Sequence, residues 1–362
     1  AGNISGTTRN ESELIIDTEI PDIPGVGFPS SPAKNGTVTV TKSSDSVSWE
    51  YSINSGDTWN TGVETTFVLT HDTYANGVIQ VRSADAAGNI SETRANASEL
   101  IIDTVVPDSP SVVFPNSPAK NGTVTVTKSD DSVSWEYSIN SGVEWVTGDG
   151  TTFVLADGTY AYGVIRVRSA DAAGNISGTT RNESELIIDT VVPDSPGVGF
   201  PSSPAMDGTV TVNKSDDSVS WEYSVNSGDT WVTGDGTTFV LTHDTYATDV
   251  IQVRSADAAG NISGTTRNES ELIIDTEIPD IPGVGFPSSP AKNGTVTVTK
   301  SSDSVSWEYS INSGDTWNTG VETTFVLTHD TYANGVIQVR SADAAGNISE
   351  TRANASELII DT

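Results

Sequence analysis

The chain contains no cysteine, few basic residues and no long apolar run. The absence of Cys from its 362 residues excludes disulfide bonds and thiolate chemistry. No apolar stretch approaches the length of a membrane helix and no signal peptide is visible, so we expect no membrane insertion by this segment. Asp and Glu number 49 against 17 Lys and Arg, and the net charge is −32. Such a surface repels nucleic acid and anionic lipid and attracts cations, although a halophile-like acidic surface is an alternative explanation.

What the chain does contain is an internal repeat. The sequence Leu-Ile-Ile-Asp-Thr returns at a constant interval of 86 residues (103 − 17), with its aspartate at Asp17, Asp103, Asp189, Asp275 and Asp361. The interval predicts four full repeats after the C-terminal part of a preceding one, with the boundaries 1–18, 19–104, 105–190, 191–276 and 277–362. Residues 1–104 and 259–362 are identical. We therefore expect the chain to be a window from a longer array.

Each repeat reads as a small β-domain. In the second repeat, Thr123–Lys128 alternates polar and apolar residues, which places Val124 and Val126 on a core-facing side. The same alternation over Ser132–Ile139 places four residues on one side of a third strand: Val133, Trp135, Tyr137 and Ile139. Helical periodicity is missing, and turn residues recur about every ten residues.

The pattern predicts seven strands in each repeat. In the second they are Ser111–Phe114, Thr123–Lys128, Ser132–Ile139, a strand around Trp145, Thr151–Leu155, Gly163–Ser169 and a last strand ending at Glu185–Asp189, with a corner at Asp157–Tyr160. A tryptophan on the third strand and a tyrosine just before the sixth match immunoglobulin-like sandwiches, in which that tyrosine forms a corner hydrogen bond. The predicted fold is all-β, a tandem array of seven-stranded Greek-key sandwiches of the immunoglobulin-like type.

Two motifs in each repeat carry a family resemblance. Asp-Ala-Ala-Gly-Asn-Ile-Ser, as at Asp171–Ser177, is followed by an apolar strand and then by Asp-Thr-x-x-Pro-Asp-x-Pro. The combination covers essentially the whole chain and resembles the bacterial Ig-like (BIg) repeats of giant secreted and surface adhesins, the RTX-type large repetitive proteins. The resemblance implies an extracellular stalk at the bacterial cell surface, often with calcium at its joints. The stretch Ser177–Glu183 is longer than in that family, so its local geometry stays open.

Acidic residues gather in sequence at the joints. In an immunoglobulin-type sandwich, the linker meets the loops after the second and sixth strands of the domain that it enters. Carboxylates and amide carbonyls brought together in this way suit Ca²⁺, whereas ordinary Asx turns are the alternative explanation. In the second repeat the predicted ligands are Asp103, Asp108, Asp130, Asp131, Asp171 and Asn175. The corresponding sets are Asp17, Asp22, Asp45, Asp85 and Asn89; Asp189, Asp194, Asp216, Asp217, Asp257 and Asn261; and Asp275, Asp280, Asp303, Asp343 and Asn347.

Two other features invite a functional interpretation. Ser52–Trp59 resembles the Asp-box hairpin of sialidases, with Asn54 at the usual aspartate position. A packed hairpin tryptophan is favoured there over sugar binding through Trp59, Trp145, Trp231 and Trp317. Three histidines lie beside Ser and Asp, namely His71, His243 and His329. No nucleophile-elbow motif accompanies them, so we expect them to be loop residues and the chain to have no enzyme activity.

These observations predict a structural extender region of a bacterial cell-surface adhesin, stiffened by calcium at the joints. Its partners would be neighbouring repeats of the same chain and, through a distal domain, host or surface glycans, in cell adhesion or biofilm formation. Two alternatives stay open. The repeats could bind glycans or a partner chain by avidity, or Glu13–Asp17 could complete a neighbouring subunit by strand addition and so build an extracellular filament.

Overall fold

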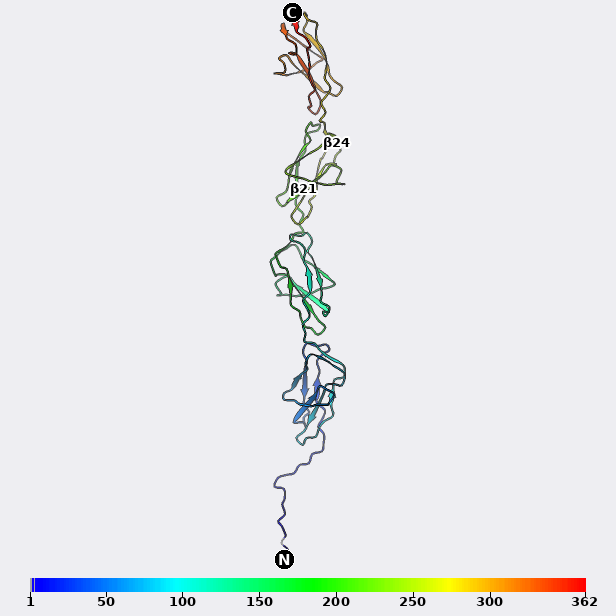
Figure 1. Cartoon of the computed structure of the whole chain (residues 1–362), viewed down its shortest axis with the longest axis vertical. Helices are drawn as coiled ribbons and strands as arrows, with labels where there is room; N and C mark the ends of the chain where they lie inside the picture. Colours follow the sequence, from blue (N-terminus) through cyan, green and yellow to red (C-terminus); the bar gives the residue numbers. More distant parts are fainter. Residues whose placement is uncertain (1, 3) are drawn as a thin grey trace. The chain divides into compact units, whose positions relative to one another are not determined.

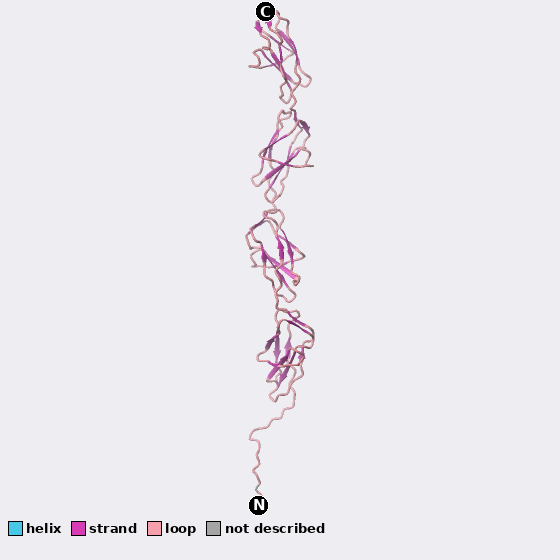
Figure 2. Cartoon of the chain, viewed as in Figure 1, coloured by secondary structure: helices cyan, strands magenta, loops and turns pink. Residues whose placement is uncertain are grey.

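The computed structural model describes residue 2 and residues 4–362, and within them it contains strands and no helix (Figure 2). The all-β prediction is therefore confirmed. The chain divides into two compact units, Ala1–Asp189 and Thr190–Thr362. Each unit contains two β-sandwich repeats, and each repeat has its own buried core. No described segment forms a helix long and apolar enough to cross a membrane.

Every repeat has nine strands, which Figure 1 colours in chain order. The first contains β1 (Gly25–Gly27), β2 (Thr37–Thr41), β3 (Ser48–Ser52), β4 (Asn60–Thr61), β5 (Thr66–Val68), β6 (Asp72–Tyr74), β7 (Gln80–Ala84), β8 (Arg94–Ala95) and β9 (Leu100–Ile102). The second contains β10 (Ser111–Val113), β11 (Thr123–Thr127), β12 (Ser134–Ser138), β13 (Val146–Thr147), β14 (Thr152–Val154), β15 (Gly158–Tyr160), β16 (Arg166–Ala170), β17 (Thr180–Arg181) and β18 (Leu186–Ile188).

The other two repeats follow the same order. The third contains β19 (Gly197–Gly199), β20 (Thr209–Asn213), β21 (Ser220–Ser224), β22 (Val232–Thr233), β23 (Thr238–Val240), β24 (Asp244–Tyr246), β25 (Gln252–Ala256), β26 (Thr266–Arg267) and β27 (Leu272–Ile274). The fourth contains β28 (Gly283–Gly285), β29 (Thr295–Thr299), β30 (Ser306–Ser310), β31 (Asn318–Thr319), β32 (Thr324–Val326), β33 (Asp330–Tyr332), β34 (Gln338–Ala342), β35 (Arg352–Ala353) and β36 (Leu358–Ile360).

The strands of a repeat form two layers. In the second repeat, one sheet has the order β10-β11-β14 and the other has the order β13-β12-β16-β17, with antiparallel pairing throughout. The last strand, β18, pairs with β15, and a parallel bridge joins Ile188 to Ala119. The last strand of each repeat therefore lies in its own sandwich, immediately before the linker to the next.

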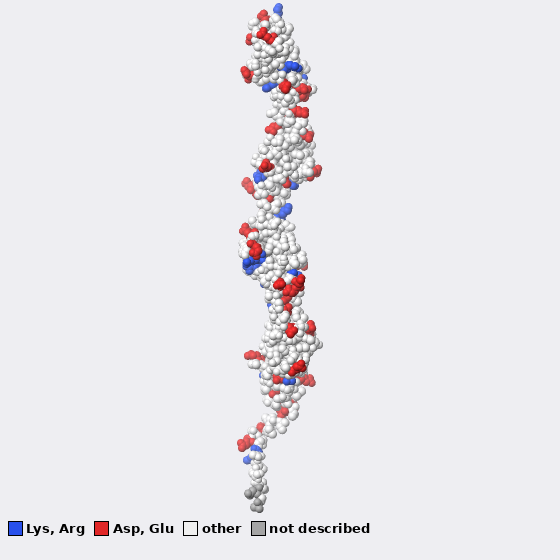
Figure 3. Space-filling model, viewed as in Figure 1, with Lys and Arg blue, Asp and Glu red and all other residues white. Residues whose placement is uncertain are grey.

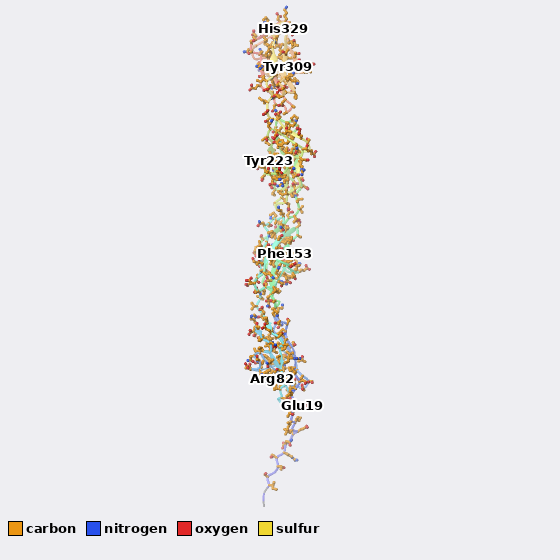
Figure 4. All side chains as sticks on the ribbon, turned by 90° about the vertical axis from the view of Figure 1, so that its right-hand side faces the viewer. Glu19, Arg82, Phe153, Tyr223, Tyr309 and His329 are labelled. Atoms are coloured by element: carbon orange, nitrogen blue, oxygen red, sulfur yellow. The ribbon has the colours of Figure 1, made fainter. Side chains whose placement is uncertain are left out.

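Aromatic rings fill the space between the sheets. Trp135 is 2% exposed, and Tyr137 stacks on Phe153 with 4.1 Å between ring centroids. The other three repeats have the same packing. Figure 4 labels Phe153 of the second repeat, Tyr223 of the third and Tyr309 of the fourth. A side chain at Gly148 would overlap the indole of Trp135, so the turn beside the core needs glycine. These rings pack with buried aliphatic residues such as Leu155 and Ile165, and together they form the apolar core of the repeat.

The predicted strand faces are confirmed in part. Val124 and Val126 are 0% and 1% exposed, as the alternation predicts. Val133 and Ile139 lie just outside β12 and are exposed, because the strand is shorter than its apolar pattern. The corner hydrogen bond is confirmed, since Tyr160 Oη donates to the carbonyl of Ala156 at 3.1 Å.

The strand count differs from the sequence prediction. The predicted corner Asp157–Tyr160 contains β15, and the stretch Ser177–Glu183, whose geometry the sequence leaves open, contains β17. Asn182, which is 2% exposed, holds this second region in place. Its Oδ1 accepts from the Ile165 N–H at 3.0 Å, and its Nδ2 donates to two carbonyls, those of Ala161 and Ser184. A single buried amide thus ties the last loops of the repeat together.

Replacing this amide should destabilise the second repeat locally. Asn182→Ala leaves the buried Ile165 N–H without its partner and removes the bonds to the part-buried carbonyls of Ala161 and Ser184. An unsatisfied buried group costs on the order of 1–3 kcal/mol. We expect faster hydrogen exchange of the Ile165 amide, measured on the peptide around Tyr162–Arg166, whose sequence occurs in no other repeat. The exposed change Asn116→Ala is the control. Equal protection in the two variants would contradict the assigned role.

Candidate functional site: the joint between repeats

The joint is built around a turn at the N-terminal pole of each repeat, Asp171–Asn175 in the second. Asp171 Oδ1 accepts from the Asn175 N–H, and Asp171 Oδ2 accepts from Asn175 Nδ2, both at 2.8 Å. Gly174 has φ +86°, a left-handed conformation that glycine adopts without strain. The turn therefore fixes the orientation of both polar side chains before any neighbour is present.

The turn also keeps its carboxylate ionised. Burial disfavours the charged form of Asp171, but hydrogen bonds from the Asn175 amide and from backbone N–H groups of the turn outweigh it. The pKa of Asp171 therefore lies below its ordinary value. The pKa of Asp257, in the third repeat, is lowered in the same way.

The amide of this turn reaches the preceding repeat. Asn175 Nδ2 also donates to the backbone carbonyl of Asp103, at 2.8 Å, where the last strand of the first repeat passes into the linker. Within Thr190–Thr362, Asn347 Nδ2 donates to the carbonyl of Asp275 at the same distance. The same contact thus closes one joint in each compact unit.

Coverage by the preceding repeat buries the turn. Asp171 and Asn175 are each 8% exposed, whereas Asp85 and Asn89 of the first repeat are only half-buried. The first repeat has an identical turn but is preceded only by the partial repeat. There Asn89 Nδ2 still donates to the Asp17 carbonyl, at 3.1 Å. The turn is therefore complete on its own and becomes buried when a folded repeat lies against it.

The linker also contacts the loop after the second strand, as the sequence predicts. In the first and fourth repeats, a loop carboxylate accepts from a linker N–H: Asp45 Oδ2 from Asp22 and Asp303 Oδ2 from Asp280. In the second and third repeats a loop serine hydroxyl donates to a linker carbonyl: Ser129 to Asp108 and Ser215 to Asp194.

The remaining predicted ligands are less closely associated. Asp103 Oδ1 accepts from the Val105 N–H and lies 3.4 Å from His71 Nδ1. Asp108, Asp130 and Asp131 are exposed. Among the described residues, no group of three or more His, Asp or Glu side chains is arranged to hold a metal ion. Acidic side chains are instead scattered over the visible face of each repeat (Figure 3).

The donor set fits a hard cation in part. Asp171 Oδ2 and the Asp103 carbonyl both lie 2.8 Å from the Asn175 amide nitrogen. A half-turn of that amide would replace the nitrogen by Oδ1 and bring oxygens of three residues together, the ligand type that Ca²⁺ prefers. The nitrogen is assigned to that position because both neighbours are acceptors. The residues for a cation are therefore adjacent, and calcium stays a prediction.

The structure adds residues that sequence reasoning missed. Lys34 Nζ of the first repeat donates to the carbonyl of Gly174, across the joint, at 3.1 Å. Thr180 Oγ1 donates to the linker carbonyl of Pro110 at 2.6 Å. Only the spacing of the lysines, which recur 86 residues apart at Lys34 and Lys120 (120 − 34), hints at such a role in the sequence.

The hairpin tryptophans are packed. The guanidinium carbon of Arg82, labelled in Figure 4, lies 3.8 Å from the centre of the Trp59 ring, and Arg82 Nε donates to Glu50 Oε2 at 2.8 Å. All four repeats show this arrangement. Asn54 Oδ1 accepts from the Thr58 N–H within the hairpin. An arginine thus covers one face of each indole, in keeping with a packed hairpin tryptophan.

The histidines lie at the opposite pole of their repeats. His71 Nδ1 accepts from the Thr104 N–H, and His243 Nδ1 accepts from the Thr276 N–H, each at 3.2 Å. His329 Nδ1 lies 3.6 Å from Asp361 Oδ1. In the first and third repeats, the imidazole therefore contacts the backbone where the last strand passes into the linker.

Comparison with known proteins gives limited similarity. No protein-family model matches the chain. Exoglucanase B of Cellulomonas fimi is 28% identical over 283 residues, which are 67% of this chain and 25% of that protein. The chain thus spans about a quarter of the length of this relative. The resemblance to bacterial Ig-like adhesin repeats stays a prediction.

Solved structures of tandem modules are also similar. Fibronectin(III)-like modules of Clostridium thermocellum CbhA match with a TM-score of 0.33 and 13% identity, over 46% of this chain and 94% of theirs. The FN1–FN3 domains of chicken CNTN1 match with a TM-score of 0.30 and 13% identity, over 70% of this chain and 99% of theirs. Scores this low carry no argument. The strand pairing within each repeat defines the class: the chain is a tandem array of β-sandwich domains.

The lowered pKa of Asp171 predicts acid sensitivity of the joint. A carboxyl whose folded-state pKa is depressed stabilises the fold above its ordinary pKa of about 4, and this stabilisation is lost as the pH falls through the folded-state value. Asp171→Asn cannot ionise and turns an amide towards Asn175, so the variant should melt at a lower temperature. The difference from the unmodified chain should be largest at neutral pH and shrink in acid. Calorimetric melting across the pH range measures it, and a constant difference would contradict the prediction.

Proposed function

We propose that this chain is an extender, a series of β-sandwich modules that separates other parts of a longer protein. The observation that carries the proposal is the joint contact from the Asn175 amide to the Asp103 carbonyl, repeated at Asn347 and Asp275. Each repeat has a complete core, so a repeat can be added without redesign of its neighbours. Proline at positions 107 and 110 restricts the linker, because it fixes φ and keeps the preceding residue extended.

The similarity to Exoglucanase B supports the general part of this proposal. The matched region is 25% of that protein, so sequence of this type occurs within a longer chain. The finer proposal is a stalk of a bacterial surface adhesin, supported by the Asp-Ala-Ala-Gly-Asn turn and the proline-bounded linker of every repeat. The chain would then lie outside the cell and hold a distal glycan-binding domain away from the surface.

The two alternative functions receive less support. Strand addition needs a repeat that lacks its last strand, yet Leu100, Leu186, Leu272 and Leu358 are each 4% exposed within their own sandwiches. Sugar binding by the hairpin tryptophans would have to use rings that are already covered on one face by arginine.

Calcium is part of the proposal as a stiffener of the joints. Two oxygens already converge on the Asn175 amide, and a cation would add ligand bonds between a turn of one repeat and a backbone carbonyl of the repeat before it. The cation would also neutralise part of the net charge of −32, which otherwise makes the chain repel itself.

An extender should shorten by a constant length for each repeat removed. Deletion of residues 105–190 should reduce the maximum dimension in small-angle scattering by on the order of 30–40 Å, the span of strands of this length with their loops. Deletion of residues 191–276 should give the same reduction. Circular dichroism checks that the remaining repeats are folded. A maximum dimension that does not change would mean that the repeats pack side by side.

Calcium binding at the joint has its own test. Asp103→Ala combined with Asp171→Ala should remove one site, so the Ca²⁺ stoichiometry of the full chain in calorimetric titration should fall by the share of one joint. The charge-matched control is Asp57→Ala with Asp149→Ala, two exposed residues away from the joint. Loss of calcium binding in the control alone, or no binding by the unmodified chain, refutes the calcium proposal and leaves the extender proposal in place.

A further inference from the structure

The joint between the first and second repeats contains a second hydrogen bond besides that of Asn175. Lys34 Nζ donates to the Gly174 carbonyl at 3.1 Å. The lysine backbone is held in position because the preceding residue, Ala33, pairs with the last strand of its repeat. The Ala33 N–H donates to the Ile101 carbonyl, and the Ala33 carbonyl accepts from the Asp103 N–H, both at 2.9 Å. Lys34 therefore links the C-terminal pole of one repeat to the turn of the next.

The joint between the third and fourth repeats lacks this bond. Met206 occupies the position equivalent to Lys34, two repeats later (206 − 34 = 172). Its backbone neighbour Ala205 makes the same pair of bonds to Ile273 and Asp275, so the local geometry is unchanged. A thioether has no donor hydrogen, and Met206 is 57% exposed. Asn347 still donates to the Asp275 carbonyl, so this joint keeps one of the two cross-joint bonds.

The linkers of these two joints also differ in the hydrogen bonds that hold them. Two hydroxyl groups hold the linker into the second repeat. Ser129 Oγ donates to the Asp108 carbonyl, and Thr180 Oγ1 donates to the Pro110 carbonyl. The linker into the fourth is held by the Asp280 N–H on Asp303. Arg352 stands at the position of Thr180.

The linker and the loop beside it also vary together. A methyl group on Gly178 would lie 2.8 Å from the Ser109 hydroxyl, so a larger residue there would require Ser109 to rotate. The fourth repeat has Ile281 and Glu350 at these two positions. The linker residue and the loop residue therefore differ together between the second and the fourth repeats.

The sequence arranges the two kinds of joint in a fixed order. Lys120, Ser195, Gly264 and Thr266 give the second-to-third joint the residues of the first-to-second joint. Within the third repeat, Thr266 Oγ1 donates to the Pro196 carbonyl, as Thr180 does to Pro110. The linker into the first repeat has the sequence of the linker into the fourth, since residues 1–104 and 259–362 are identical.

We propose that the two joints within the compact units are of two mechanical kinds, a lysine-latched joint between the first and second repeats and a latch-free joint between the third and fourth, and that the latch-free joint bends more. The latch is the hydrogen bond that Lys34 Nζ donates to the Gly174 carbonyl, in the turn of the next repeat. The residue at the position of Lys34 then sets how freely each of these two joints bends. The proposed difference between the joints does not require bound calcium.

Distance distributions between spin labels test the proposal on the full chain. The absence of native Cys makes engineered pairs unique. Val68→Cys with Val154→Cys spans the latched joint, and Val240→Cys with Val326→Cys spans the latch-free joint at equivalent positions. All four valines are between 67% and 69% exposed, so labels there should not disturb the cores. The measurements are made with a chelator present.

We expect a narrower distribution for the first pair. Lys34→Met should widen it towards that of the second pair, and Met206→Lys should narrow the second. The loss of one net hydrogen bond corresponds to about a fivefold change in the ratio of closed to open joints. Lys42→Met is the matched control, because Lys42 donates within its own repeat, to the Val47 carbonyl. Equal widths in the unmodified chain, or an unchanged width after either exchange at positions 34 and 206, would overturn the proposal.

Discussion

The arrangement of consecutive repeats depends on one preorganised amide. Asn175 is oriented by its own turn, through Asp171 and the turn backbone, before it donates to the Asp103 carbonyl of the preceding repeat. A side chain already fixed in place loses little conformational entropy when it binds. A hydrogen bond that would be weak between two mobile surface groups therefore becomes useful at a joint. The same turn is present but half-buried in the first repeat, which shows that the turn does not require the neighbour in order to form.

Much of the fold follows from the sequence because strand alternation is a local signal. Val124 and Val126 alternate with threonines that face solvent, and their burial requires no knowledge of the rest of the chain. The corner tyrosine could likewise be placed from its position before the sixth predicted strand, since Tyr160 bonds a carbonyl only four residues away. The prediction of core-facing residues was wrong at the two ends of the third predicted strand. Val133 and Ile139 extend the apolar pattern beyond β12 without facing the core.

The parts that could not be predicted depend on contacts far apart in sequence. Asn182 lies in a polar stretch that resembles a loop, and its burial becomes visible only when β16, β17 and β18 are in place around it. The joint was predicted correctly at the level of segments, since the linker does contact the two loops. The carboxylates did not cluster as expected. Like charges brought to within 4 Å repel by about 4 kcal/mol at an effective dielectric constant near 20, so without a counter-ion hydration keeps them apart.

A residue change in the core of such a domain has wider effects than a change at its poles. A core residue such as Trp135 contacts both sheets and a glycine turn, so a change there disturbs many neighbours at once. The Lys34 side chain donates to the adjacent repeat, and the equivalent residue is Met206, beside which the β-bridge is unchanged. Nearest-neighbour arrays confine such an exchange to a single joint. An exchange at a pole can therefore alter the coupling between two domains and leave the core of each domain intact.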